Sequence, residues 1–186
     1  PGALDPRRAP RLRPRQVYPT KDHATFASAL TALAAEPGFA PPAAAALAVA
    51  GPVSGNAARL TNVAWTVDGD ALTDALGVPV AVLNDFEAAG YGALDLETRP
   101  SAGDVLVLNP GAPTPRAPIA VLGPGTGLGQ AQLMWCDAEG GYRVWPSEGA
   151  HAGFAPRGPA QRALHASLEA DLGYVTVEHV ACGAGL

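Results

Sequence analysis

An apolar run that ends at a carboxylate constrains the fold of this chain more than any other stretch. The run from Val78 to Leu83 has the length and the β-branching of a buried strand. It stops at Asn84 and Asp85, and a helix-like segment of small residues follows. Because ligands of open α/β sheets collect at the carboxyl ends of the strands, Asp85 is a candidate catalytic group. Capping of the following helix is the alternative interpretation, and this stretch taken alone favours it.

Helix-like and strand-like segments follow one another along the rest of the chain. Helical spacing and stop signals predict helices over 22–35 and 160–172, a short helix between Asp68 as N-cap and Gly77, and the start of another helix at 177–181. Apolar runs predict strands over 44–50, 58–65, 78–83, 105–108, 118–122, 128–135 and 142–145. The prolines of 110–118 predict a linker, so we expect one lobe over 17–111 and part of a second over 112–186.

The composition is that of a globular chain with an unusual amino end. Of its 186 residues, 48% are hydrophobic and 16% are charged, which is material for one ordinary domain or two incomplete lobes. Residues 1–16 hold five arginines against one aspartate, among prolines, and we expect a solvated, disordered tail there. Because the whole chain has a formal net charge of −5, the remainder is acidic and offers no electrostatic footprint for nucleic acid.

Cysteine usage and hydropathy indicate the compartment. Cys136 and Cys182 are far apart and have no metal-ligand spacing, so we expect two reduced thiols in a cytoplasmic protein. No apolar run approaches the roughly 20 residues that span a bilayer, and the amino end has no signal-peptide core. We therefore expect no membrane association. The first residue is Pro1, so we do not expect the chain to begin at a natural start.

A glycine-rich loop, Gly-Pro-Gly-Thr-Gly-Leu-Gly at 123–129, lies between two predicted strands. Glycines allow backbone N–H groups to approach a phosphate closely, and the Thr126 hydroxyl adds a donor. The loop is not a P-loop, since no Gly-Lys-Ser/Thr follows, and it lacks the helix that a dinucleotide fingerprint requires. For a lone glycine-rich loop, a plain hairpin remains the usual alternative.

Glu148 and His151 form a second polar pair, in a loop with small neighbours. Gly149, between the pair, and Gly153, after it, argue against a helix, and no partner set of histidines or cysteines is in view, so no metal site is expected. Recognition of a polyhydroxylated ligand fits these side chains better, because carboxylates accept hydroxyl hydrogen bonds and histidine can donate or accept. An ordinary surface pair is the equal alternative. Asn62, as a turn residue, and Glu178, at the start of a predicted helix, are weak signals singly.

Taken in order, these motifs resemble the bacterial glucokinases of the hexokinase and actin-like ATPase superfamily. The resemblance covers roughly residues 17–186. It rests on a series of short motifs in the family's order: Ala50-Gly51-Pro52-Val53-Ser54-Gly55, Leu60-Thr61-Asn62, Leu83-Asn84-Asp85-Phe86, Gly123-Pro124-Gly125-Thr126-Gly127-Leu128-Gly129, Glu148-Gly149-Ala150-His151 with Phe154-Ala155-Pro156, and Val177-Glu178-His179-Val180. The resemblance implies phosphorylation of glucose at its 6-hydroxyl, with ATP and Mg²⁺, and it leaves a homodimer of the intact protein open.

The resemblance also implies a role for each candidate. Asp85 matches the family's general base, which would accept the proton of the sugar hydroxyl. The family's sugar-hydroxyl ligands are matched by Asn84, Glu148, His151 and Glu178, while Asn62 matches a position near the sugar. The turn Gly125, Thr126 and Gly127 matches the family's second phosphate loop. Phosphoryl transfer depends chiefly on positioning and electrostatic stabilisation, which agrees with these assignments.

Two departures from the family bear on function. The family opens with an Asp-x-Gly-Gly-Thr-x-x-Arg-type phosphate loop, where this chain has prolines and arginines, and it continues past the Gly-Ala-Gly-Leu end with a segment that holds adenosine. The implied fold is thus a pair of actin-like, ribonuclease H-like α/β lobes, incomplete at both ends. A non-catalytic fragment or degenerate sugar-binding protein is the alternative. The related ROK kinases and repressors carry a cysteine-rich zinc motif after the histidine, and none follows His151.

Overall fold

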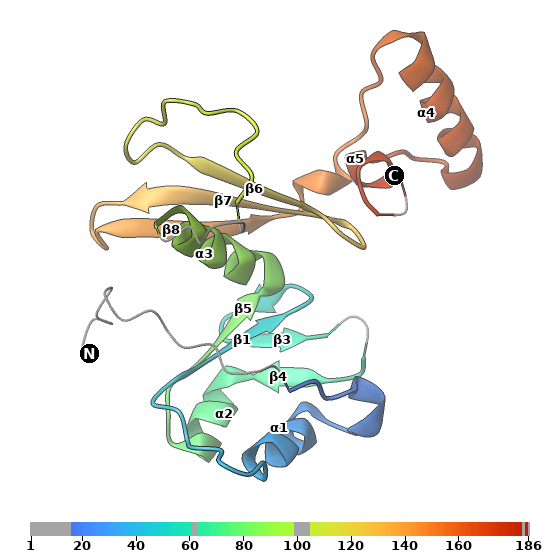
Figure 1. Cartoon of the computed structure of the whole chain (residues 1–186). Helices are drawn as coiled ribbons and strands as arrows, with labels where there is room; N and C mark the ends of the chain where they lie inside the picture. Colours follow the sequence, from blue (N-terminus) through green and yellow to red (C-terminus); the bar gives the residue numbers. More distant parts are fainter. Residues whose placement is uncertain (1–15, 61–62, 99–104, 184, 186) are drawn as a thin grey trace.

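The computed structural model describes residues 16–60, 63–98, 105–183 and 185, as an α/β molecule with three small sheets (Figure 1). The Arg/Pro-rich tail predicted for 1–16 lies outside the described residues except for its last position. The predicted lobe division at residues 111 and 112 stays a prediction.

The first sheet is a parallel pair that fixes the start of the site. Strand β1 (Ala45–Val49) pairs with β5 (Val80–Asn84), and the register places Val49 opposite Asn84. Parallel strands bring their carboxyl ends to one edge. The residues after β1 and Asp85 after β5 therefore lie at the same edge of the sheet, and the strand predicted over 78–83 is confirmed.

A three-stranded antiparallel sheet packs beside this pair. It consists of β2 (Val53–Ser54), β3 (Ala57–Arg59) and β4 (Thr66–Asp68). Helix α1 (Phe26–Ala34) and the 3₁₀ turn η1 (Thr20–Asp22) precede it in the chain. The shared core contains four buried residues, with Phe26, Leu47, Val53, Leu60 and Leu72 packed around them: Val49, Ala58, Val67 and Val82.

Helix α2 (Gly69–Leu76) has the ends that its sequence predicts. The Asp68 side chain accepts hydrogen bonds from Asp70 N and Ala71 N, both at 3.0 Å. Gly77 ends the helix in the left-handed region at φ 68°, where a residue without Cβ is favoured. The N-cap and C-terminal predictions for this helix are both confirmed.

The Asn56 side chain joins the two neighbouring sheets. Its Nδ2 donates to Val80 O at 2.9 Å and to Asp70 Oδ1 at 2.8 Å, while its Oδ1 accepts from Val82 N at 2.8 Å. The amide thereby bonds the edge of β5 that faces away from β1, as a neighbouring strand would. Asn56 holds the strand that carries the site.

Replacing Asn56 by alanine is expected to lower the free energy of unfolding by about 1–3 kcal/mol, because part-buried backbone groups of β5 lose their partner. Urea unfolding monitored by circular dichroism measures the change. The matched control is Asn109→Ala, at an exposed asparagine, which should shift stability by less than about 0.5 kcal/mol. Equal midpoints for the two variants would contradict a joining role for Asn56.

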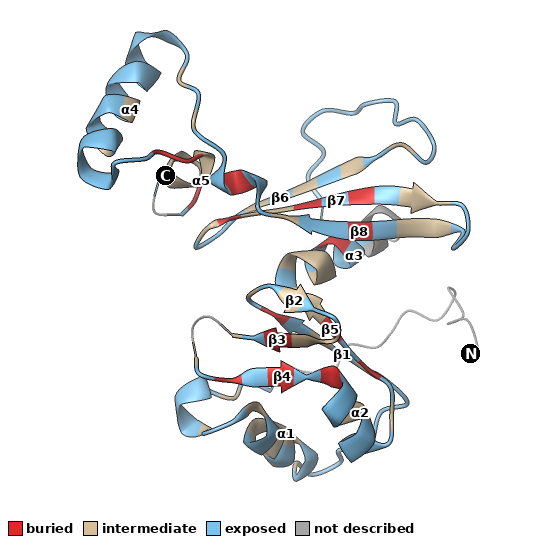
Figure 2. Cartoon of the chain, turned by 180° about the vertical axis from the view of Figure 1, so that it is seen from behind, coloured by how far each residue is buried: buried red, intermediate tan, exposed pale blue. Residues whose placement is uncertain are grey.

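The two sheets around the core of Val49, Ala58, Val67 and Val82 form the first packing unit. The second packing unit is an antiparallel sheet covered by one helix. Strands β6 (Ile119–Pro124), β7 (Leu128–Cys136) and β8 (Gly141–Ser147) pair in that order, and α3 (Asp85–Thr98) lies against β7 and β8. Phe86 and Leu94 of the helix pack on the buried residues Ala131, Leu133 and Val144. Figure 2 shows buried positions on the central strands of both packing units. Because α3 begins where β5 ends, it links the first sheet to this one.

The carboxyl-terminal part is helical and lies beyond the turned end of β6 and β7 (Figure 1). It contains η2 (Gly149–His151), α4 (Gly158–Leu172) and α5 (Val177–Val180). Gly173 ends α4 at φ 73°, directly after the helix predicted over 160–172. No helix within the described ranges is long and apolar enough to cross a bilayer.

Three predictions of local structure are wrong. The run 105–108 is not a strand, and Leu106 and Leu108 are 82% and 88% exposed. An apolar run forms a strand only where a neighbouring strand takes its hydrogen bonds, and the described residues provide none there. The strand predicted over 58–65 ends at Arg59, and the glycines around His151 do not prevent the 3₁₀ turn η2. The short strands β2 and β4 were not predicted.

Candidate active site

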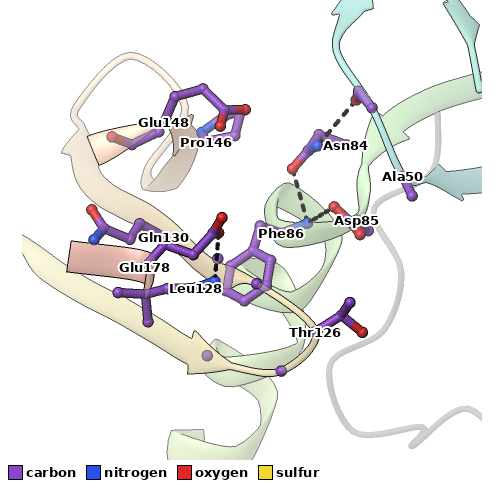
Figure 3. Close-up of a pocket in the computed structure, with 16 residues that line it drawn as sticks. Ala50, Asn84, Asp85, Phe86, Thr126, Leu128, Gln130, Pro146, Glu148 and Glu178 are labelled. Atoms are coloured by element: carbon purple, nitrogen blue, oxygen red, sulfur yellow. Dashed lines mark hydrogen bonds between the residues drawn. The ribbon is translucent and has the colours of Figure 1, made fainter. Parts of the chain in front are cut away.

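A cavity of about 350 Å³ lies where the carboxyl ends of β1 and β5 face the turn between β6 and β7 (Figure 3). Backbone and side chains from both packing units and from α5 line it. Its polar side chains come from seven residues: Asn84, Asp85, Thr126, Gln130, Ser147, Glu148 and Glu178. Among the described residues that line it there is no lysine or arginine.

Asn84, and not Asp85, caps helix α3. Asn84 Oδ1 accepts from Phe86 N at 2.9 Å and from Glu87 N at 3.3 Å, which is the pattern of an N-cap residue. Its Nδ2 donates to Gly51 O at 3.1 Å and so fixes the segment after β1. Capping therefore does not account for the carboxylate that follows it.

Asp85 is exposed at the cavity, in the first turn of α3. Its Oδ1 accepts one hydrogen bond, from Phe86 N at 2.9 Å. No described residue donates to its Oδ2. A solvated carboxylate with a free oxygen can accept a proton from a bound hydroxyl group.

The turn Gly125-Thr126-Gly127 closes the opposite side of the cavity. Gly125 N donates to Gly127 O at 2.8 Å, and Gly125 O accepts from Gly183 N at 2.7 Å. The N–H groups of Thr126 and Gly127 have no acceptor within the described part of the chain. These two amides and the Thr126 hydroxyl are therefore available for an anion.

The Phe86 ring holds the start of α3 against the β6–β7 hairpin. Gly123 and Gly129 pair across the two strands, and a Cβ at either position would overlap the ring. Figure 3 shows the ring between Asp85 and Leu128. The two glycines thus allow the helix that carries Asp85 to approach the strands that carry the turn.

Glu148, His151 and Glu178 form a chain of polar contacts beside the cavity. His151 Nε2 is 3.4 Å from Glu148 Oε2, and His151 Nδ1 is 3.9 Å from Glu178 Oε1. The two carboxylates line the cavity, and the histidine connects them from outside its lining. Their side chains are exposed to different degrees: 85% for Glu148, 58% for His151 and 26% for Glu178. Oxygens and an imidazole in this arrangement suit a ligand with several hydroxyl groups.

The structure brings most of the predicted residues together. Asn62 lies outside the described residues. Gln130 and Ser147 also line the cavity but were not predicted, because alternation along a strand does not distinguish a cavity side chain from a surface one. Within the described ranges, no group of three or more histidine, cysteine or acidic residues is placed to hold a metal ion.

Comparison with known proteins gives a consistent result. A family model described as Glucokinase matches residues 4–186. The glucokinase of Nostoc sp. is 43% identical over 148 residues, covering 78% of this chain and 42% of that protein. The glucokinase of Chromohalobacter salexigens is 35% identical over 191 residues, covering 100% of this chain and 55% of that protein.

Solved structures agree with the sequence comparison. A glucokinase from an Antarctic psychrotroph superposes with a TM-score of 0.75 at 29% identity, covering 90% of this chain and 51% of that one. The Balamuthia mandrillaris glucokinase in complex with glucose superposes with a TM-score of 0.53 at 25% identity, covering 75% of this chain and 44% of that one. The chain thus spans about half the length of the proteins that it matches.

Proposed function

The chain belongs to the glucokinase family and has that family's hexokinase-type α/β fold, and from this premise we propose that it carries the sugar site and the base of an ATP-dependent glucokinase. The reaction would transfer the γ-phosphoryl group of ATP to the 6-hydroxyl of glucose. The observation that carries the proposal is the position of Asp85. Its free carboxylate oxygen shares one cavity with the two unbonded amides of the Thr126 turn.

Each side of the cavity would have its own task. The amides of Thr126 and Gly127 would hold phosphate oxygens, while Asn84, Glu148, His151 and Glu178 would bind the remaining sugar hydroxyls. As the bond from O6 to phosphorus forms and the bond from phosphorus to the leaving ADP oxygen breaks, the O6 proton would pass to Asp85. Catalysis by such a site consists of positioning and electrostatic stabilisation.

The donor chemistry of the cavity is compatible with Mg²⁺. This ion prefers oxygen ligands and is commonly held by one or two carboxylates together with substrate phosphates and water. Asp85 and Glu178 supply carboxylates at the cavity, so the lack of a dedicated three-residue cluster in the described part of the chain does not conflict with it. When bound, the ion would neutralise charge on the phosphates.

A non-catalytic sugar-binding role is the second candidate, and the charge of the cavity favours it for this chain by itself. The described lining contains three carboxylates and no cationic side chain. Nucleotide phosphates therefore meet two amides and a hydroxyl with little to offset the acidic groups. Under this alternative the chain binds glucose but holds ATP poorly.

Calorimetric titration of the chain with glucose, and separately with MgATP, distinguishes the two candidates. The glucokinase proposal predicts that both ligands bind and that the full-length gene product phosphorylates glucose in a coupled assay. Glucose binding without measurable ATP binding, and without turnover by the full-length product, would favour the sugar-binding alternative. Binding of neither ligand would contradict both.

For the intact protein we propose a cytoplasmic location. Cys136 and Cys182 are both free thiols in the structure, in agreement with a reducing compartment. The family resemblance leaves a homodimer of the intact protein open, and light scattering on the full-length gene product tests it. We propose no nucleic-acid partner, because the chain is acidic.

A further inference from the structure

The Glu178 side chain contacts the phosphate turn directly, although the proposed function assigns it to the sugar. Its Oε2 accepts a hydrogen bond from Leu128 N, the residue after Gly127, at 2.8 Å (Figure 3). We infer that Glu178 positions the turn for the nucleotide as well as binding the sugar, so that one carboxylate couples the two halves of the site. This inference rests on the proposed function.

The turn is built around this carboxylate. A Cβ at Gly127 would overlap Glu178 Oε2, so the absence of a side chain there lets the carboxylate reach the backbone. Leu128 is largely buried and its amide bond to Glu178 is part-buried, so this amide has no acceptor other than Glu178 among the described residues. The contact spans 50 positions in sequence and fixes the start of β7. Because Thr126 and Gly127 lie between the fixed residues Gly125 and Leu128, their free amides keep a defined direction.

The other carboxylate oxygen faces the sugar side. Glu178 Oε1 is 3.9 Å from His151 Nδ1, which is too far for a hydrogen bond. No other described residue donates a hydrogen bond to Oε1. A carboxylate has two oxygens and about four acceptor positions. Glu178 can therefore hold Leu128 N with Oε2 and accept a sugar hydroxyl with Oε1 at the same time.

Helix α5 is held firmly enough to serve as a common support. Thr176 is buried, and its hydroxyl accepts from His179 N at 3.3 Å while His179 Nδ1 accepts from Thr176 N at 3.2 Å. Val177 N donates to Ala152 O at 3.0 Å, next to His151. Gly183 N bonds the turn itself at Gly125 O. The segment that carries Glu178 is thus anchored both to the residue that follows His151 and to the Gly125-Thr126-Gly127 turn.

Two substitutions at Glu178 separate its two tasks. Glu178→Gln keeps an oxygen that can accept from Leu128 N but loses the negative charge offered to the sugar. Glu178→Ala loses both. Glu148→Gln is the matched control, since Glu148 lines the same cavity and no hydrogen bond or ion pair within the described residues joins it to the turn.

Steady-state kinetics of the full-length gene product should separate the effect on the KM for glucose from the effect on the KM for ATP. We expect all three variants to raise the KM for glucose by about tenfold or more. Only Glu178→Ala should raise the KM for ATP, also by about tenfold, because only there does the Leu128 amide lose its acceptor. Equal KM values for ATP in the alanine variant and the wild type would overturn the inference. So would an equal rise in the alanine and glutamine variants.

Amide hydrogen exchange at Leu128, measured by NMR, gives a readout that does not depend on catalysis. The Leu128 amide should stay protected in the wild type and in the glutamine and Glu148 variants, and exchange at least tenfold faster in the alanine variant. If the wild type proves inactive while this pattern holds, the proposed function fails and the positioning contact stands. Unchanged exchange in the alanine variant would overturn the contact itself.

Discussion

Replacing Asp85 by asparagine is expected to abolish most glucose phosphorylation, lowering kcat by about 10²–10⁴-fold, the usual loss for a general base. The amide has the shape of the carboxylate but cannot take the proton of the 6-hydroxyl. Its oxygen can still accept from Phe86 N, which is the hydrogen bond that Asp85 Oδ1 makes. Since Asn84 supplies the helix cap, stability should change by less than about 0.5 kcal/mol.

The same reasoning predicts that binding survives the substitution. Glucose affinity, measured by calorimetry on the variant, should stay near the wild-type value because the other proposed sugar ligands remain. Asp74→Asn is the matched control, at an exposed aspartate on α2 away from the cavity, and should leave kcat unchanged. A kcat near the wild-type value in the Asp85 variant would remove Asp85 from the chemistry.

The second large effect is expected from Gly129→Ala, which should lower both stability and activity. The new Cβ would overlap the Phe86 ring, and the ring cannot move toward Gly123, where the space is equally limited. Overpacking of this kind costs about 1–3 kcal/mol. The ring must shift, and Phe86 directly follows Asp85 in the chain. Because a misplacement of about 1 Å can cost about 10² in rate, kcat should fall by a similar factor.

Removing the ring tests whether this contact is the cause. In the double variant Gly129→Ala with Phe86→Leu, part of the lost stability should return, so the two substitutions should not be additive. Gly141→Ala is the matched control, at a strand glycine where a Cβ meets nothing within 4 Å. Thermal unfolding of the wild type, the Gly129→Ala and Phe86→Leu single variants and the double variant measures the coupling. A Gly129 variant that behaves like the Gly141 variant would contradict the packing of Phe86 on the glycine pair.

Local sequence signals, such as apolar runs and capping residues, predicted the elements whose ends and patterns lie in neighbouring residues. The strand that ends at Asn84 was predictable from its apolar run, and α2 from the Asp68 cap and Gly77. The run 105–108 shows the limit, because its apolar residues carry no information about whether a partner strand is present. Strands as short as Val53–Ser54 have no periodicity to detect.

The residues of the site were easier to predict than their contacts. The order of motifs indicated Asp85, the Thr126 turn and the Glu148, His151 and Glu178 group, and the structure places these around one cavity or in contact with its lining. The hydrogen bond from Leu128 N to Glu178 and the packing of Phe86 on Gly129 connect residues that are far apart in the sequence, and both depend on the three-dimensional fold. No spacing rule in one sequence encodes such contacts.

Whether the site phosphorylates glucose is tested most directly by identifying what the full-length protein makes from glucose and MgATP. Phosphorus NMR of the reaction mixture identifies it without a coupling enzyme. We expect glucose 6-phosphate and ADP in equal amounts, and their loss in the Asp85→Asn variant. Release of inorganic phosphate without a sugar phosphate, or no consumption of ATP at all, would contradict it.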